Sequence, residues 1–265
     1  MDPVLAFLAG LLQGVTEWLP VSSSGQVVIL LENLGADADD ALALAFFLHF
    51  GTLLAVVMRL RGDVRQVLGD LGRWRTDPMV RFLLVATLVS LPVGFILVQT
   101  LEAAVEGSLS GVLLTVLVGA LLILTGFVLR VAKGRLGERR VADLGDGDAA
   151  VLGLVQGVAA LPGISRSGMT VSALLIDRVD ADEALRLSFL MSIPVTIAVV
   201  AYEAVTWDMA SIGALPVAIG VVASLAFGYL TIDGLMALSR RIDWSVFCVA
   251  FGGIAVVLGL LLALV

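Results

Sequence analysis

The sequence predicts an all-α polytopic membrane protein built as an inverted-topology repeat, with about six transmembrane helices and two re-entrant helical hairpins. Three observations support this prediction: an apolar composition, an internal repeat at a fixed spacing, and basic residues confined to one side. The 265-residue chain is 60% hydrophobic, and its mean hydropathy is +1.08. Soluble domains are only about half apolar. We therefore expect a single membrane domain over residues 1–265.

Six stretches are long and apolar enough to cross a bilayer as helices, which takes about 20 residues each. They are residues 41–60, 80–101, 109–131, 184–205, 212–232 and 244–265. Four further apolar stretches are too short to cross alone, and they form two pairs that each flank a polar segment. The pairs are 4–15 with 26–31, and 149–161 with 169–176. Irregular backbone survives at membrane depth only inside protein or beside a wet cavity, so each pair predicts a re-entrant hairpin.

The two halves of the chain repeat one another at a constant offset of 143 residues. At this offset Gln13-Gly14-Val15 becomes Gln156-Gly157-Val158, and Ser22-Ser23-Ser24-Gly25 becomes Ser165-Arg166-Ser167-Gly168. The match continues without gaps between residues 40–57 and 183–200. We therefore expect repeat one at about 1–131, repeat two at about 149–265, and a charged cytoplasmic linker at 132–148. A hairpin plus three spans per half turns the halves upside down relative to each other, as in many transporters.

Basic residues lie on one side of this topology. Loops 61–78, 132–148, 178–183 and 233–243, with the span ends beside them, hold every Lys and Arg except Arg166. Loops 32–40, 102–108 and 206–211 on the other side carry only acidic charges. The positive-inside rule makes the basic side cytoplasmic, so we expect a multi-pass plasma-membrane protein with both termini outside. The net charge of −7 argues against nucleic acid as a partner.

In that topology the tips of the two hairpins meet inside the membrane. Glu17 stands in the first tip where the second has Ala160, and Arg166 stands in the second where the first has Ser23. An intramembrane Glu or Arg costs about 3 kcal/mol and is a functional candidate by default. A buried structural ion pair is the alternative interpretation, but the tips hold more hydroxyl groups than one ion pair requires.

Glycine and serine at a helix start leave backbone N–H groups free to bind an anion, with the positive end of the helix dipole behind them. The guanidinium of Arg166 adds two-pronged recognition of phosphate oxygens. The Ser-Arg-Ser-Gly tip at 165–168 therefore predicts a phosphate site near the middle of the membrane.

The segments Glu-Trp-Leu-Pro-Val-Ser-Ser-Ser-Gly at 17–25 and Pro-Gly-Ile-Ser-Arg-Ser-Gly-Met-Thr at 162–170 resemble the two signature motifs of the undecaprenyl-diphosphate phosphatases, the bacitracin-resistance membrane proteins. The similarity covers nearly the whole chain. It implies an enzyme that removes the terminal phosphate of an undecaprenyl-type polyprenyl diphosphate at the outer face and so recycles a lipid carrier of the cell envelope. It also implies a divalent cation, Mg²⁺ or Ca²⁺. We expect this lipid and membrane lipids as partners, and leave a homodimer open.

The resemblance assigns roles residue by residue. The resemblance makes Glu17 a catalytic residue and candidate metal ligand, Ser23 the nucleophilic or phosphate-contacting serine, and Arg166 the essential phosphate-binding arginine. Candidate supporting contacts to phosphate are Gln13, Ser22, Ser24, Gln26, Ser165, Ser167, Gly168 and Thr170. Two mechanisms stay open: attack by Ser23 with Glu17 as base, or attack by water promoted by Glu17 and a cation.

Two positions depart from the family pattern. Gln13 stands where the family usually has Glu, and Gln26 where it usually has His. Glutamine neither takes a proton near neutral pH nor attacks phosphorus, and losing an acid weakens metal binding because hard cations favour carboxylate oxygens. His49 is the only histidine. It lies about 12 Å into its span, and we interpret it either as a substitute base and phosphate contact or as a hydrogen-bonded packing residue.

A transporter is the rival class of function, because alternating access uses inverted repeats around an anion site at the midplane. With Gln26 in place of the histidine, the chain would then flip a polyprenyl phosphate without hydrolysing it. A small-anion carrier is a third option that the resemblance disfavours. Phosphate release from polyprenyl diphosphate by the purified protein discriminates among them.

Overall fold

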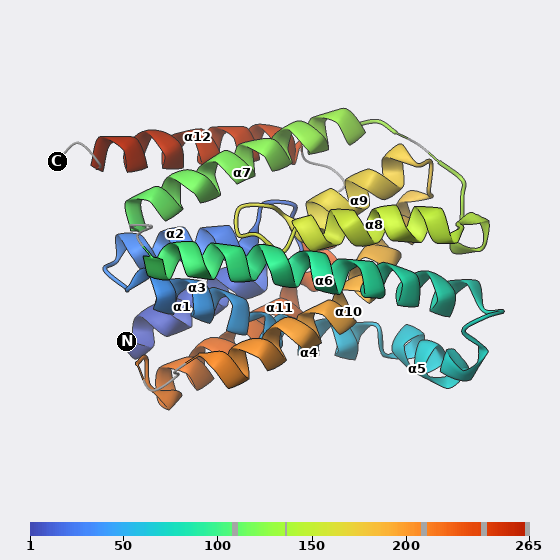
Figure 1. Cartoon of the computed structure of the whole chain (residues 1–265), viewed down its shortest axis with the longest axis horizontal. Coiled ribbons are helices and arrows are strands. Elements are labelled where there is room, and N and C mark those ends of the chain that lie inside the picture. Colours follow the sequence, from blue (N-terminus) through green and yellow to red (C-terminus); the bar gives the residue numbers. More distant parts are fainter. Residues whose placement is uncertain (108–110, 136, 208–210, 240–242, 263–265) are drawn as a thin grey trace.

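The computed structural model describes residues 1–107, 111–135, 137–207, 211–239 and 243–262. This part of the chain is almost entirely helical, with one isolated β-bridge between Arg139 and Val179. Its described ranges hold twelve α-helices and two short 3-10 helices, η1 (Leu71–Arg73) and η2 (Val141–Asp143). Most of the helices lie along the long axis of the molecule (Figure 1).

Six helical segments of the described chain are long and apolar enough to cross a membrane, which confirms the predicted all-α polytopic class. They are Ala38–Arg59, Pro78–Leu101, Val112–Ala132, Ala181–Thr206, Ala214–Leu238 and Trp244–Leu261. The first comprises α3 (Ala38–Phe47) and α4 (His49–Arg59), which meet at Leu48. The others belong to α6 (Pro78–Gly107), α7 (Gly111–Ala132), α10 (Ala181–Thr206), α11 (Ala214–Ser239) and α12 (Trp244–Leu262).

The four short apolar stretches form helices that end inside the molecule. α1 (Pro3–Thr16) and α2 (Ser23–Asn33) make one hairpin, and α8 (Asp146–Val158) and α9 (Arg166–Ile176) make the other. The bounds of α9 are those of α2 shifted by 143 residues. In Figure 1, α1 enters from the left end and α8 from the right, and the two irregular tips lie near the middle. α7 and α12, late in each half, also run in opposite directions.

Serine side chains fix where the inner helices begin. Ser22 caps α2 by accepting a hydrogen bond of 3.4 Å from the Gly25 N–H, and Ser165 caps α9 by accepting one of 3.1 Å from the Gly168 N–H. An N-cap serine satisfies one of the N–H groups that a helix start leaves unpaired. The shared Ser-x-x-Gly pattern therefore starts one helix at each tip.

Small residues let each hairpin approach a span from the other half of the chain. A Cβ added to Gly10 on α1 would lie 2.1 Å from the Gly220 carbonyl oxygen on α11. One added to Gly153 on α8 would lie 2.5 Å from the Ala86 carbonyl oxygen on α6. Close backbone approach at small residues is a usual basis of helix association in membranes. Each tip is thus held in place by the opposite half.

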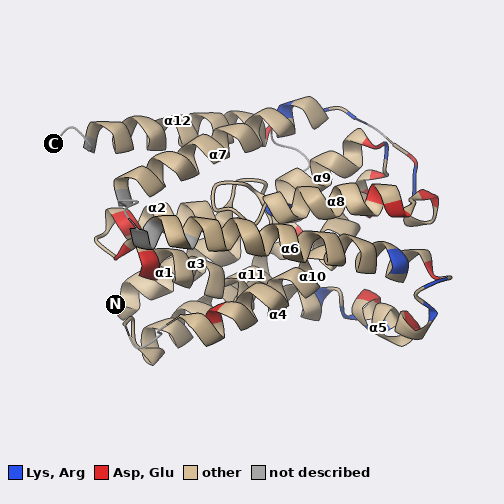
Figure 2. Cartoon of the chain, in the orientation of Figure 1, with Lys and Arg blue, Asp and Glu red and all other residues tan. Residues whose placement is uncertain are grey.

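Arginine and lysine gather mostly at the right-hand end of the molecule in Figure 2. Segment 61–78, expected as a basic loop, contains α5 (Arg61–Asp70). Val64 of this helix packs against the core, and Asp63 binds Arg186 of α10 at 2.5 Å. The residues that Val64 and Asp63 contact lie far away in the sequence, so the local charge pattern of the segment does not predict the helix.

Candidate active site

The tips of the two hairpins contact each other directly. The Ser22 hydroxyl oxygen accepts a hydrogen bond of 2.9 Å from the Gly163 N–H. Gly163 has φ +97°, and a Cβ added there would lie 2.5 Å from the Val118 carbonyl oxygen. Ser22 itself has φ 57°, in the left-handed region that residues other than glycine rarely adopt. Strained backbone of this kind persists where the surrounding structure imposes it, and it clusters at functional sites.

Glu17 and Arg166, one from each tip, form an ion pair. Arg166 Nη2 donates to Glu17 Oε1, and Arg166 Nη1 lies 3.5 Å from the Ser188 carbonyl oxygen. The Glu17 side chain is 6% exposed and that of Arg166 is 16% exposed. Charges removed from water to this extent require a partner. The pair therefore joins the two halves of the chain deep inside the molecule.

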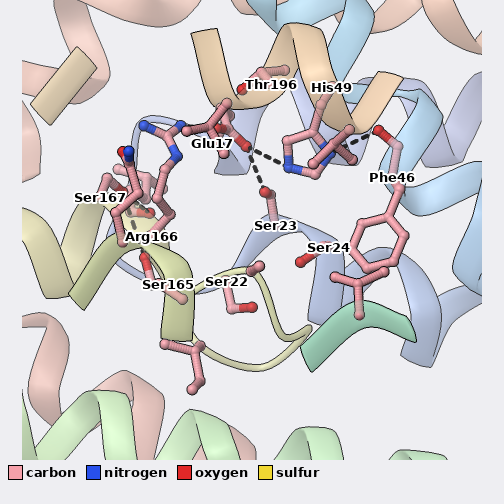
Figure 3. A pocket seen from close by; sticks show the side chains of 18 residues that line it. Glu17, Ser22, Ser23, Ser24, Phe46, His49, Ser165, Arg166, Ser167 and Thr196 are labelled. Atoms are coloured by element: carbon pink, nitrogen blue, oxygen red, sulfur yellow. Dashed lines mark hydrogen bonds and ion pairs between the residues drawn. The ribbon is translucent and has the colours of Figure 1, made fainter. Parts of the chain in front are cut away.

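The second carboxylate oxygen of Glu17 contacts three further polar groups. Ser23 Oγ donates to Glu17 Oε2 at 2.6 Å, and Gln13 Nε2 donates to the same oxygen at 2.9 Å. His49 Nε2 lies 3.4 Å from it (Figure 3). A carboxylate that accepts the hydrogen of a serine hydroxyl is placed to remove that proton, which is how a base activates such a nucleophile.

His49 is oriented by the backbone of α3. Its Nδ1 lies 2.9 Å from the Ala45 carbonyl oxygen and 3.2 Å from that of Phe46. Because a carbonyl oxygen only accepts, Nδ1 carries a proton and Nε2 is the nitrogen that faces Glu17. His49 is thus hydrogen-bonded, as the packing interpretation requires, and it also adjoins the carboxylate, as the substitute-base interpretation requires.

These side chains line a pocket of about 70 Å³ (Figure 3). The predicted site residues in its wall are Glu17, Ser22, Ser23, Ser24, His49, Ser165, Arg166 and Ser167. The first turns of α2 and α9 both border it. The pocket therefore combines a guanidinium, several hydroxyls and two helix N-termini, which are the groups that bind phosphate in proteins.

Four predicted site residues lie outside this wall: Gln13, Gln26, Gly168 and Thr170. Gln26 donates to the Val21 carbonyl oxygen at 2.8 Å, within the first tip. Thr170 donates to the Arg166 carbonyl oxygen at 2.8 Å, one turn into α9. Gly168 bonds the capping serine, and Gln13 bonds Glu17. These contacts shape the two tips from behind.

Two polar wall residues were not predicted as site residues, Gln156 on α8 and Thr196 on α10. Gln156 is the counterpart of Gln13 at the offset of 143 residues, so the repeat held a signal for it. Thr196 carried no such signal because it lies within an apolar span. Only the tertiary fold brings α10 against the tips and puts this threonine at the pocket (Figure 3).

An apolar groove of about 340 Å³ adjoins the pocket between α6, α8 and α10. Val98, Ala160, Val195 and Val199 line both hollows, so the two lie side by side. Most of the other groove walls are apolar as well, including Leu91, Pro92, Phe95 and Ala198. A small pocket that holds charged and hydroxyl groups, beside a larger apolar groove, fits a ligand with a charged head and a hydrocarbon tail.

A family model described as bacitracin resistance protein BacA matches residues 6–259. The chain belongs to the BacA family. It is 41% identical over 273 residues to a protein of Haloarcula marismortui named undecaprenyl-diphosphatase, with 100% of each chain covered. Proteins of the same name show 38% identity in Methanothrix thermoacetophila, with 97% of each chain covered, and 35% in Anaeromyxobacter dehalogenans, with 94% of this chain and 88% of the relative covered. The resemblance stated from the two motifs is thereby confirmed.

The divalent cation that the family resemblance implies would need oxygen ligands at the pocket. Among the described residues, Glu17 is the only carboxylate in the pocket wall, and no cluster of three His, Cys, Asp or Glu side chains is arranged to hold a metal. Gln13 Oε1 is buried without a hydrogen-bond partner in the described chain, but it lies outside the pocket wall. Mg²⁺ is often held by one or two carboxylates, with substrate phosphates and water as its other ligands. The residues therefore fit a cation shared with a phosphate ligand.

Proposed function

We propose that this chain is an integral membrane phosphatase that hydrolyses the terminal phosphate of undecaprenyl diphosphate or a similar polyprenyl diphosphate. The observation that supports this most is the convergence of Arg166, Glu17 and Ser23 in one pocket that adjoins an apolar groove. The relatives cited above carry the name undecaprenyl-diphosphatase. Such an enzyme returns a lipid carrier to its monophosphate form.

The pocket binds the diphosphate head of the substrate, and the groove binds its hydrocarbon tail. Arg166 and the N-termini of α2 and α9 bind the terminal phosphate, since both supply N–H donors and positive charge. The part of the polyprenyl chain next to the diphosphate lies in the groove, where packing against apolar side chains replaces packing against lipid tails. Head and tail binding together align the phosphorus with Ser23.

Ser23 attacks the terminal phosphorus while its hydroxyl proton passes to Glu17, which already accepts that hydrogen at 2.6 Å. The bond from phosphorus to the bridging oxygen breaks, polyprenyl monophosphate leaves, and the phosphoryl group stays on Ser23. Water then attacks the phosphorus, the bond to Ser23 Oγ breaks, and Glu17 returns the proton to Ser23 as orthophosphate departs. Arg166 offsets the negative charge that accumulates on the phosphoryl oxygens.

Glu17 would hold a divalent cation together with oxygens of the diphosphate and water. When bound, the cation supplies positive charge that offsets the charge of the two phosphates. Because Glu17 Oε1 is already bonded to Arg166, the protein alone would bind the cation weakly. We therefore expect the protein to bind Mg²⁺ more tightly when the diphosphate is present.

We further propose that residues 1–265 form one domain of two inverted halves in the plasma membrane, with both termini outside. The equal bounds of α2 and α9 at the 143-residue offset support the repeat. The gathering of arginine at one end of the molecule supports the orientation through the positive-inside rule (Figure 2). Reporter fusions at residue 1 and within 132–148 test the orientation, and reporter activity on the reverse sides contradicts it.

The decisive experiment measures phosphate release from undecaprenyl diphosphate by the purified protein in detergent. Wild type releases phosphate and lipid monophosphate in equal amounts. Glu17→Gln, Ser23→Ala and Arg166→Ala each lose at least about 100-fold in kcat/KM. Arg59→Gln is the matched control, because Arg59 pairs with Asp233 at the exposed surface, and its activity stays within about twofold. A wild-type protein that binds the lipid without releasing phosphate contradicts the phosphatase.

The rival function, a flippase for polyprenyl phosphate, draws support from a third hollow. This cavity of about 440 Å³ is lined by Lys133, Arg135 and Trp244, and it also reaches Ser167 in the wall of the pocket. Hollows on two sides of one tip suit alternating access. Transfer of fluorescent polyprenyl phosphate between the leaflets of proteoliposomes, in the absence of any hydrolysis, is the result that favours this function.

A further inference from the structure

Gln156, a residue of the pocket wall, carries a buried acceptor atom that nothing in the described chain satisfies. Its Nε2 lies 3.2 Å from the Met191 carbonyl oxygen and 3.4 Å from Ser90 Oγ. Because the carbonyl only accepts, the amide nitrogen must face Met191, and this fixes which way the amide points. Gln156 Oε1 has no hydrogen-bond partner among the described residues, although the residue is 1% exposed.

An unpaired buried acceptor costs about 1–3 kcal/mol, and most buried polar groups in proteins do have a partner. Such an atom therefore marks the position of a bound water or of a ligand group that donates a hydrogen. A fully ionised phosphate oxygen does not qualify, because it only accepts. The occupant of this position must carry a hydrogen.

Gln156 stands where the polar pocket meets the apolar groove. It lines the pocket, while the next residue, Gly157, and its partner Ser90 line the groove. If the terminal phosphate lies at Arg166 and the tail lies in the groove, the bond that breaks lies at this boundary. This placement rests on the phosphatase proposed above.

In a displacement at phosphorus the attacking and leaving oxygens lie in line on opposite sides. The lipid phosphate leaves from the groove side, opposite Ser23, and the water of the second step must approach from that same side. We propose that Gln156 binds and orients the water that hydrolyses phosphorylated Ser23.

In this step the water donates one hydrogen to Gln156 Oε1 while its oxygen attacks the phosphorus. The bond between phosphorus and Ser23 Oγ breaks, and Ser23 takes back the proton held by Glu17. Orthophosphate leaves with both hydrogens of the water. Gln156 neither gains nor loses a proton, so its part is to position the water.

The test separates formation of phosphoserine from its breakdown. Gln156→Leu removes the acceptor at similar volume, so formation proceeds and breakdown slows by about 10–100-fold. Rapid mixing with undecaprenyl diphosphate then gives a burst of about one lipid monophosphate per protein, followed by slow turnover. Mass spectrometry of the quenched variant detects phosphate on Ser23. Gln66→Leu, the same change at an exposed position on α5, serves as the control and shows no added burst.

Gln156→Glu keeps an acceptor oxygen and serves as the second variant if the leucine variant does not fold. In this variant the rate of phosphoserine breakdown stays within about tenfold of the wild-type rate. Equal slowing of both steps in Gln156→Leu, or a rise in KM with kcat unchanged, shows that Gln156 binds the head group and overturns the proposal. Slow breakdown in Gln156→Glu overturns it too. A wild type that releases no phosphate rejects the phosphatase itself, whatever the variants do.

Discussion

Glu17 Oε2 accepts the hydroxyl hydrogen of Ser23 at 2.6 Å, while Glu17 Oε1 is bound by the guanidinium of Arg166 from the opposite half of the chain. One carboxylate therefore links the two hairpins and also faces the proposed nucleophile. Stability and activity both depend on it, and suitable variants separate the two effects.

Replacing Arg166 with lysine tests the need for two-pronged recognition of phosphate. Lysine keeps the positive charge beside Glu17 but offers a point charge in place of a planar fork. We expect kcat/KM to fall by about 100-fold, while the midpoint of thermal unfolding changes little. Phosphate-release kinetics and thermal unfolding in detergent measure the two quantities. A lysine variant with wild-type kcat/KM contradicts this account of the pocket.

Removing the Arg166 charge altogether tests the structural side of the pair. Arg166→Met leaves the buried Glu17 carboxylate without its cation, which costs about 3–5 kcal/mol of unfolding free energy. The double variant Arg166→Met with Glu17→Gln regains most of that loss, because no charge is then left unpaired. Denaturant titration of the single and double variants measures the coupling. Additive losses in the double variant show that the pair contributes no stability.

Two neighbouring serines distinguish the two mechanisms that the sequence leaves open, attack by Ser23 and direct attack by water. Ser23 bonds Glu17, whereas Ser24 lines the same pocket without that contact. Attack by Ser23 predicts that Ser23→Ala loses at least about 100-fold in kcat/KM and that Ser24→Ala loses about tenfold or less. Steady-state phosphate release measures both. Similar small losses in the two variants favour direct attack by water.

Much of this arrangement could be predicted because the repeat leaves a signal in the sequence itself. The offset that relates Ser22 to Ser165 identified both helix starts, and hydropathy identified the six spans. Gln156 was missed as a site residue although the same offset pointed to it. Thr196 and the helix α5 depend on contacts with distant segments, and no local pattern encodes those contacts.

Gly163→Ala tests the contact between the tips. Gly163 has φ +97° and no room for a Cβ, since one would lie 2.5 Å from the Val118 carbonyl oxygen. Gly134 is the matched control, with φ +75° and nothing within 4 Å of an added Cβ. Both alanine variants lose about 1 kcal/mol to backbone strain, and Gly163→Ala loses more because the tip must also move. Equal losses of unfolding free energy in the two variants show that the tip tolerates displacement.

Asp243, just before α12, makes the stability of the contact between the ends of α7 and α12 depend on pH. Hydrogen bonds from Lys133, and then from Ser245, hold the pKa of the Asp243 carboxyl well below its usual range. Because the pKa is lower in the folded state, this contribution to stability is fully present above the unfolded value of about 3.9. It is lost as the pH falls through the native pKa.

Lys133→Met removes the strongest of these bonds, so the variant is less stable than wild type at pH 6. The difference shrinks as the pH falls below about 4, because the carboxyl is then protonated in the unfolded chains of both proteins. Denaturant titrations at several pH values measure this difference in stability. Tryptophan fluorescence reports the unfolding, since Trp244 lines the same cavity as Lys133 and Asp243. Arg130→Gln removes another cation 3.0 Å from Asp243 and serves as the comparison, with a smaller effect. A difference that stays constant from pH 6 to about 3 assigns the role of Lys133 to packing alone.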